Sequence, residues 1–275
     1  MKPQTLVAIT VIALLVAGCG GGGTKLASDG SPPITPPVSP SADELGRLPS
    51  GGSVLSPTVF QIGAGSEWRY NVTGWDLAGK QTDVKGTYRT TVSAETILPP
   101  PDLPYSNDTL HYFLETADVV GSGIKILTSE RRFFKQDADG TIWVYGWYNW
   151  EDPSSPHWAD ERYAWVRSPL SAGVSWEALV KETLPDNTGE LKTTILLDEH
   201  WVVTGTETLT IPAGRCQTYR VTGNGKFGGL DPKKIKNMDV WWAPQIGAPA
   251  QVRLTYEADG QTVRLLFQLA SLTVH

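Results

Sequence analysis

Apolar and polar residues alternate along several segments of the chain beyond residue 60. In the clearest segment, polar residues separate Val252, Leu254 and Tyr256. The same period of two runs through residues 68–73 and 88–95, and through much of 191–203. Alternation of this kind, with β-branched and aromatic side chains, is typical of strands that bury one face. The sequence therefore predicts an all-β domain.

Turn-forming residues separate these segments at short intervals. Residues 137–140 and 257–260 both end in Ala-Asp-Gly, which favours hairpins with a glycine in the left-handed conformation. Strands joined by short turns must be antiparallel, because a parallel pair needs a long crossover connection. We therefore expect an antiparallel sandwich or a strongly curved half-barrel. A glycine and a serine precede both Trp68 and Trp176, which predicts that the two tryptophans enter the core at equivalent strand starts.

The N-terminus has the pattern of a secretion signal. Lys2 precedes an apolar stretch from Leu6 to Val16, which is shorter than the roughly 18 residues that a membrane-spanning helix needs. The small residues before Cys19 resemble the lipobox of bacterial lipoproteins, with Val16 at the place where leucine is usual. This resemblance implies that Cys19 carries a diacylglycerol thioether and becomes an acylated N-terminus.

A stretch rich in Gly, Pro and Ser follows, and it cannot bury enough apolar surface to offset the entropy of ordering it. The sequence thus predicts a lipoprotein signal peptide at 1–18, a lipidated, disordered tether at 19–57 and one antiparallel β domain at 58–275. The expected location is the bacterial cell envelope. If the host is Gram-negative, Gly20 rather than an aspartate after the cysteine resembles the sorting pattern for the outer membrane.

Two later segments resemble the hairpins of a diffuse group of uncharacterised bacterial envelope lipoproteins. Residues 210–216 hold a Pro-Ala-Gly turn between strand-like runs, and residues 241–247 read Trp-Trp-Ala-Pro-Gln-Ile-Gly before another strand. The chain departs from this group at Cys216 and Gln245, where an aromatic residue and a glycine are usual. The group is similar in outline to half-barrel lipoprotein carriers, and this resemblance implies a cavity for a hydrophobic ligand.

Charge and cysteine content narrow the classes of partner. The chain has 29 Asp and Glu against 23 Lys and Arg, and the latter fall to 22 when Lys2 leaves with the signal peptide. This acidic balance disfavours binding to nucleic acid and electrostatic attachment to anionic lipids. Once Cys19 is lipidated, Cys216 is the remaining thiol, and we expect it to be buried and inert.

The aromatic-rich span 143–165 is the most site-like part of the sequence. Trp143, Tyr145 and Trp147 fall on one face of a predicted strand. The loop that follows holds the candidate ligand-binding residues Trp150, His157 and Trp158. Aromatic faces beside carboxylates suit a sugar or another amphipathic ligand. The alternative is that these aromatic side chains fill a β core.

The sequence offers little support for catalysis. Adjacent carboxylates such as Asp160 and Glu161 would point to opposite faces of a strand, so a catalytic pair would have to form between separate segments. Metal-binding spacing is absent among the histidines, at positions 111, 157, 200 and 275, and no cofactor is expected.

We therefore expect a membrane-anchored lipoprotein with a non-catalytic binding or scaffolding domain, whose partner is an envelope lipid, glycan or protein. The alternatives are a carrier of hydrophobic ligands and, third, a carbohydrate-active enzyme.

Overall fold

The computed structural model describes residues 7–8, 61–121, 124–148, 156–185, 191–227, 233–258 and 261–275. Cys19, the rest of the predicted tether, Trp150 and the turn at 259–260 lie outside these ranges. Lipidation and the division of the chain into signal peptide, tether and domain therefore stay predictions.

The described residues form one sheet, and every pair of neighbours along its main path is antiparallel. Its strands are β2 (Glu67–Trp75), β3 (Gln81–Val92), β4 (His111–Gly121), β5 (Ile124–Gln136), β6 (Ile142–Tyr148), β7 (Pro156–Val166), β8 (Ser175–Pro185), β9 (Leu191–Ile211), β10 (Gly214–Phe227), β11 (Lys233–Ala243), β12 (Ala248–Ala258) and β13 (Gln261–Thr273). The 3-10 turn η2 (Pro244–Ile246) joins β11 to β12. Strand β1 (Val7–Ala8), within the predicted signal peptide, lies parallel to the start of β5.

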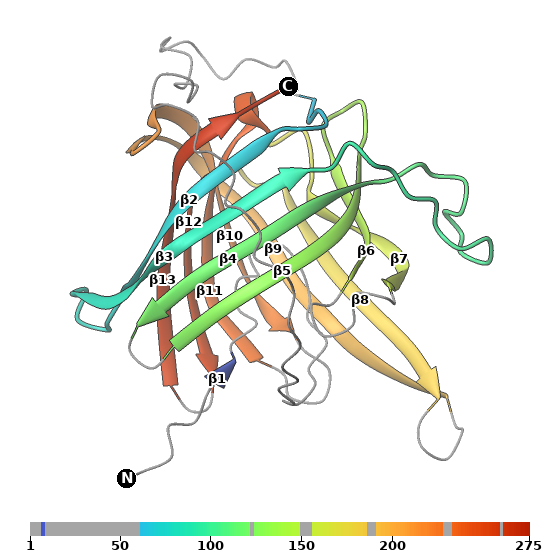
Figure 1. Cartoon of the computed structure of the whole chain (residues 1–275), viewed down its shortest axis with the longest axis horizontal. Helices are drawn as coiled ribbons and strands as arrows, with labels where there is room; N and C mark the ends of the chain where they lie inside the picture. Colours follow the sequence, from blue (N-terminus) through green and yellow to red (C-terminus); the bar gives the residue numbers. More distant parts are fainter. Residues whose placement is uncertain are drawn as a thin grey trace, which may run out of the picture.

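The order of strands across the sheet is β7-β6-β5-β4-β3-β2-β13-β12-β11-β10-β9-β8. Each strand pairs with its neighbour in sequence, except that β13 pairs with β2 while β7 and β8 form the two ends. The sheet curves so strongly that β7 and β8 nevertheless lie side by side (Figure 1). No backbone ladder joins them in the part of the chain that the structure describes. This nearly closed, barrel-like sheet confirms the predicted all-β antiparallel class.

The main core fills the inside of the sheet, as the alternating pattern predicts. Trp68, Tyr70 and Val72 of β2 are buried, and so are Val252 and Leu254 of β12. Removing this apolar surface from water is the main force that stabilises the fold. Within the described ranges, no helix has the length and apolar character needed to cross a membrane.

Gly65 and Gly173 begin two strands in the same way. Both have a positive φ, 86° and 87°, which favours glycine. The Gly65 N–H donates to the Val92 carbonyl at 2.9 Å, and the Gly173 N–H donates to the Val203 carbonyl at 2.8 Å. Each glycine is followed three residues later by a buried tryptophan, Trp68 and Trp176. The prediction of equivalent strand starts is therefore confirmed.

Two further sequence predictions are confirmed. The turn at 137–140 joins β5 to β6, with Gly140 at φ 93° and its N–H 2.9 Å from the Asp137 carbonyl. Cys216 is buried, and burial raises the pKa of its thiol to about 11. The reactive thiolate is therefore strongly disfavoured at neutral pH.

A β-bulge at Tyr145 corrects one prediction. The pairing register of β6 with both neighbouring strands shifts between Val144 and Gly146. The extra residue moves the following side chains to the opposite face. Tyr145 consequently packs outside the main core, whereas Trp147 packs within it. The expectation that Trp143, Tyr145 and Trp147 share one face is therefore wrong for Trp147.

Candidate functional site

A second, smaller apolar cluster lies on the face of the sheet that points away from the main core, which we call the outer face. The long connection between β3 and β4, seen at the right of Figure 1, covers this face over β5 and β6. It contributes Tyr105 and Leu110, which are buried together with Phe133 and Tyr145. The Tyr105 hydroxyl also donates a hydrogen bond to the Ala159 carbonyl of β7. These contacts fix the connection to the sheet.

An open groove of about 450 Å³ lies between this connection and the outer face of β6 and β7. This volume falls within the range of about 300–1,000 Å³ that is usual for small-molecule sites. Its walls combine aromatic, charged and amide side chains, contributed by Pro104, Tyr105, Asn107, Asp108, Trp143, Glu161 and Arg162.

A chain of side-chain contacts holds the polar wall of the groove in place. Lys135 forms an ion pair with Asp108 through Oδ1, and the Tyr145 hydroxyl donates to Oδ2 of Asp108 at 3.0 Å. Arg162 Nη1 donates in turn to the Tyr145 hydroxyl oxygen at 3.1 Å. The Arg162 guanidinium also lies 4.5 Å from the centre of the Trp143 ring. An exposed arginine is thus held by a hydrogen bond and an aromatic face, which is how binding sites are pre-organised.

The Trp143 indole is held as well. Its Nε1 donates to Asp137 Oδ2 at 2.7 Å, and its ring packs partly against both apolar clusters. Trp143 therefore presents a fixed, partly exposed ring in the groove.

The same contacts keep the groove's charges ionised. Partial burial raises the pKa of Asp108, but the hydrogen bonds from Lys135 and Tyr145 outweigh it and hold that pKa below its usual value. The hydrogen bond to Tyr145 raises the pKa of Arg162 further. Asp108 is consequently a carboxylate with both oxygens occupied, and Arg162 is a permanent cation.

Charged groups also lie inside the sheet. Glu115 of β4 accepts hydrogen bonds from the Tyr88 hydroxyl and from Arg132 Nη2. The Arg132 guanidinium lies 6.0 Å from the centre of the Trp165 ring. Across the interior, Glu199 of β9 accepts a hydrogen bond from Trp201 Nε1 at 3.1 Å, and burial raises its pKa to about 8. Burial is therefore expected to keep Glu199 mostly protonated at neutral pH.

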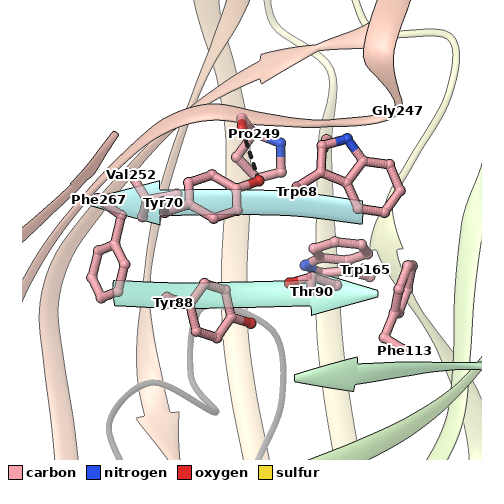
Figure 2. A pocket seen from close by; sticks show the side chains of 11 residues that line it. Trp68, Tyr70, Tyr88, Thr90, Phe113, Trp165, Gly247, Pro249, Val252 and Phe267 are labelled. Atoms are coloured by element: carbon pink, nitrogen blue, oxygen red, sulfur yellow. Dashed lines mark hydrogen bonds between the residues drawn. The ribbon is translucent and has the colours of Figure 1, made fainter. Parts of the chain in front are cut away.

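Two small cavities lie in the interior among the described residues. A cavity of about 20 Å³ lies among Trp68, Tyr88 and Trp165 on one side of the core (Figure 2). Figure 2 also shows the Tyr70 hydroxyl aimed at the Pro249 carbonyl, to which it donates at 3.0 Å. A second cavity of about 20 Å³ lies near Trp176. Each volume is close to that of one water molecule, so neither cavity has room for an acyl chain.

Two of the candidate residues predicted from the sequence, His157 and Trp158, are not among the described residues that line the groove. Trp158 stacks on Phe133 at a ring separation of 4.7 Å, and His157 stacks on Trp147 at 6.1 Å. Both side chains are half-buried. Trp150 lies outside the described residues. Ligand binding by these three residues therefore stays a prediction.

The residues that line the groove come from distant parts of the chain. Asn107 and Asp108 belong to the β3–β4 connection, whereas Glu161 and Arg162 belong to β7. Only Trp143 and the charged residues of β7 fell in the span singled out beforehand. No local pattern marks Asn107 and Asp108, because their role depends on how the connection folds over the sheet.

Comparison with known proteins adds little to this description. No protein-family model and no curated protein matches the chain. Among solved structures, a protein described as exported, with a YmcC-like fold, from Bacteroides fragilis is 11% identical at a TM-score of 0.39, covering 78% of this chain and 98% of its own. A protein described as a lipoprotein from Parabacteroides distasonis is 11% identical at a TM-score of 0.38, and the match covers 78% of this chain and 97% of its own. The hypothetical lipoprotein YmcC from Escherichia coli is 13% identical at a TM-score of 0.28, and the match covers 74% of this chain and 83% of its own.

A TM-score below 0.5 does not establish a shared fold, and the proposals that follow depend on this chain's own residues. In the described ranges, no group of three or more His, Cys, Asp or Glu residues could hold a metal ion.

Proposed function

We propose that this protein is a lipid-anchored lipoprotein of the bacterial cell envelope whose β domain binds a small polar ligand without catalysing a reaction. The anchor would be Cys19, and the residues at 19–57 would tether the domain to the membrane, the outer membrane if the host is Gram-negative. The groove beside Arg162 is the observation that supports binding. Its polar wall is ordered by Tyr145 and Trp143, although Arg162 itself is exposed.

The charges in the groove favour binding over catalysis. Two carboxylates, Asp108 and Glu161, line it. A glycosidase needs one carboxyl group with a raised pKa as the acid and a second as nucleophile or base. Asp108 has a lowered pKa, and Lys135 and Tyr145 occupy its oxygens. Asp108 therefore lacks the proton of a general acid, and the hydrogen bonds from Lys135 and Tyr145 make it a weaker nucleophile or base.

The alternative of a carrier for hydrophobic ligands receives less support. An acyl chain needs a continuous apolar cavity, and the two interior cavities described above are each about 20 Å³. The groove itself is lined in part by charged and amide groups, which an acyl chain cannot pair.

Two experiments test the proposal. Growth with radiolabelled palmitate should mark the protein, and Cys19→Ser should abolish the label and release the protein from the membrane fraction. An unlabelled protein with Cys19 intact would contradict the anchor.

Binding can be tested by screening the mature chain against a library of small polar fragments by NMR. Hits should shift the indole N–H signal of Trp143 and leave that of the buried Trp68 unchanged. If no fragment shifts Trp143, a scaffolding role replaces binding.

A further inference from the structure

We propose that the groove binds a neutral carbohydrate segment, with Arg162, Asn107 and Glu161 contacting its hydroxyl groups. This inference rests on the proposed function, because it names the ligand class of the same groove.

The mixed charges that line the groove disfavour simple ions of either sign. An anionic ligand placed against Arg162 would also meet the carboxylates of Asp108 and Glu161. A cationic ligand drawn to these carboxylates would meet the guanidinium of Arg162, which remains charged at any relevant pH. Lys135 pairs with Asp108, Arg162 and Glu161 line the groove with opposite charges, and the carboxylates of Asp137 and Asp160 act on Arg162 and Tyr105. A simple ion of either sign therefore meets at least one group of its own sign. A neutral ligand is repelled by neither the carboxylates nor the guanidinium.

The free hydrogen-bonding groups of the groove match hydroxyls. A guanidinium has five N–H donors, and the contact with Tyr145 uses Nη1 of Arg162. Asn107 offers an amide donor and acceptor, and Glu161 offers two acceptor oxygens. Both side chains belong to exposed residues on opposite walls of the groove. A sugar hydroxyl can donate and accept through the same oxygen, so it can pair with every one of these groups.

The apolar part of the groove matches the remainder of a sugar ring. Pro104 and the partly exposed Trp143 indole lie beside the polar groups, and the largely buried Tyr105 adds a smaller apolar surface. These surfaces can pack against ring C–H groups while the hydroxyls reach the polar wall. The Trp143 and Tyr105 side chains are fixed by their own hydrogen bonds to Asp137 and Ala159. A ligand therefore would not have to order them.

The test compares oligosaccharides of equal length and different charge on the mature chain. The neutral probes are maltohexaose, cellohexaose, mannohexaose and chitohexaose. The acidic probe is hexagalacturonic acid, and the basic probe is protonated hexaglucosamine. Binding is measured by titration calorimetry and by the NMR signal of the Trp143 indole N–H. We expect at least one neutral probe to bind and to shift that signal.

Variants connect the binding to the groove. Arg162→Ala, Asn107→Ala and Glu161→Gln should each weaken binding of the neutral probe by about tenfold or more, because each removes hydrogen bonds to the sugar. Arg253→Ala is the matched control, since Arg253 is also exposed and lies 5.3 Å from the Trp241 ring. Asn107 is exposed, so Asn107→Ala should report on the ligand even if Arg162→Ala alters the loop.

Each contrary outcome has a definite meaning. Binding of the acidic or basic probe alone would overturn the ligand class and leave a binding groove. Neutral binding that survives Arg162→Ala and Asn107→Ala would place the sugar elsewhere. If no oligosaccharide binds but fragments still shift the Trp143 signal, only the carbohydrate inference fails. If neither oligosaccharides nor fragments bind, the proposed binding function fails as well.

Discussion

Arg132 donates a hydrogen bond to Glu115 inside the sheet, and both side chains are almost completely buried, with 1% and 2% of their surface exposed. Burying two charges is costly, and their mutual attraction offsets much of that cost only while both are present. Glu115 also accepts a hydrogen bond from the Tyr88 hydroxyl, so these side chains link β3, β4 and β5 on the inner face of the sheet.

Removing one partner of this pair should be far more harmful than removing both. Glu115→Leu leaves Arg132 uncompensated and is expected to lower the free energy of unfolding by about 3–5 kcal/mol. The double variant Glu115→Leu with Arg132→Met should recover most of that loss, as urea denaturation of a double-mutant cycle would show. As a control, Glu67→Ala removes a more exposed ion pair with Arg69 and should cost less than about 1 kcal/mol. Losses that simply add would contradict this account.

Glu199 should make the protein less stable as the pH rises. Its pKa is raised to about 8 by burial, from an ordinary value of 4.5. Between these two values the folded protein holds a proton that the unfolded chain has already released. The free energy of unfolding should therefore fall with increasing pH, at a limiting slope of roughly 1 kcal/mol per pH unit from this group.

Urea titrations at several pH values from 5 to 8 would measure this slope. Glu199→Gln keeps the shape of the side chain but cannot ionise, so its stability should change less steeply over the same window. Asp118→Asn, at an exposed position of β4, should keep the wild-type slope. Parallel curves for wild type and Glu199→Gln would show that Glu199 titrates normally.

Trp158 should contribute to stability through its packing. It stacks on the buried Phe133 with an angle of 20° between the rings. Trp158→Ala is expected to lower the free energy of unfolding by about 2 kcal/mol, which is less than the roughly 3–5 kcal/mol expected for a fully buried aromatic such as Trp68. Thermal and urea unfolding provide the measurement. Leu98→Ala, at a position 65% exposed, should have almost no effect. An equally silent Trp158→Ala would instead favour the surface role predicted from the sequence.

Gly173 should tolerate asparagine better than valine. Its φ is 87°, and a Cβ added there would meet no atom within 4 Å, so we expect the backbone conformation to set most of the cost. Gly173→Val should destabilise the protein by about 1–2 kcal/mol or more, and Gly173→Asn by clearly less, since asparagine tolerates the left-handed conformation. Differential scanning calorimetry would rank the two. Equal losses would point to a steric cause rather than a backbone one.

The sequence was most informative where one face of a strand is uniformly apolar. The alternation around Trp68 and Val252 predicts strands whose inward residues are indeed buried. The glycines before Trp68 and Trp176 likewise mark two strand starts, and each glycine makes the equivalent backbone hydrogen bond. These features are local, because a strand's period and a turn's backbone angles depend on adjacent residues.

Features that depend on distant segments could not be predicted. Glu115 and Glu199 share their strand faces with apolar neighbours, and a lone carboxylate on such a face gives no sign of the partner it meets inside. The bulge at Tyr145 reverses which residues face inward, and the adjacent Gly146 is a local sign of it that the alternation of side chains does not show. The groove brings Asp108 together with Arg162, and only the folded connection determines that proximity.

The pairing order of the strands determines where the sheet is weakest. Everywhere else along the sheet, two segments can separate only by breaking a row of backbone hydrogen bonds, but β7 and β8 have no such row between them in the described chain. Among the described residues, side chains pack across this seam, and Trp165 and Trp176 on its two sides line one small cavity. On heating, the sheet should therefore open first along this seam, where the chain passes from its first run of paired strands to its second. The same seam should give solvent its shortest way to the interior.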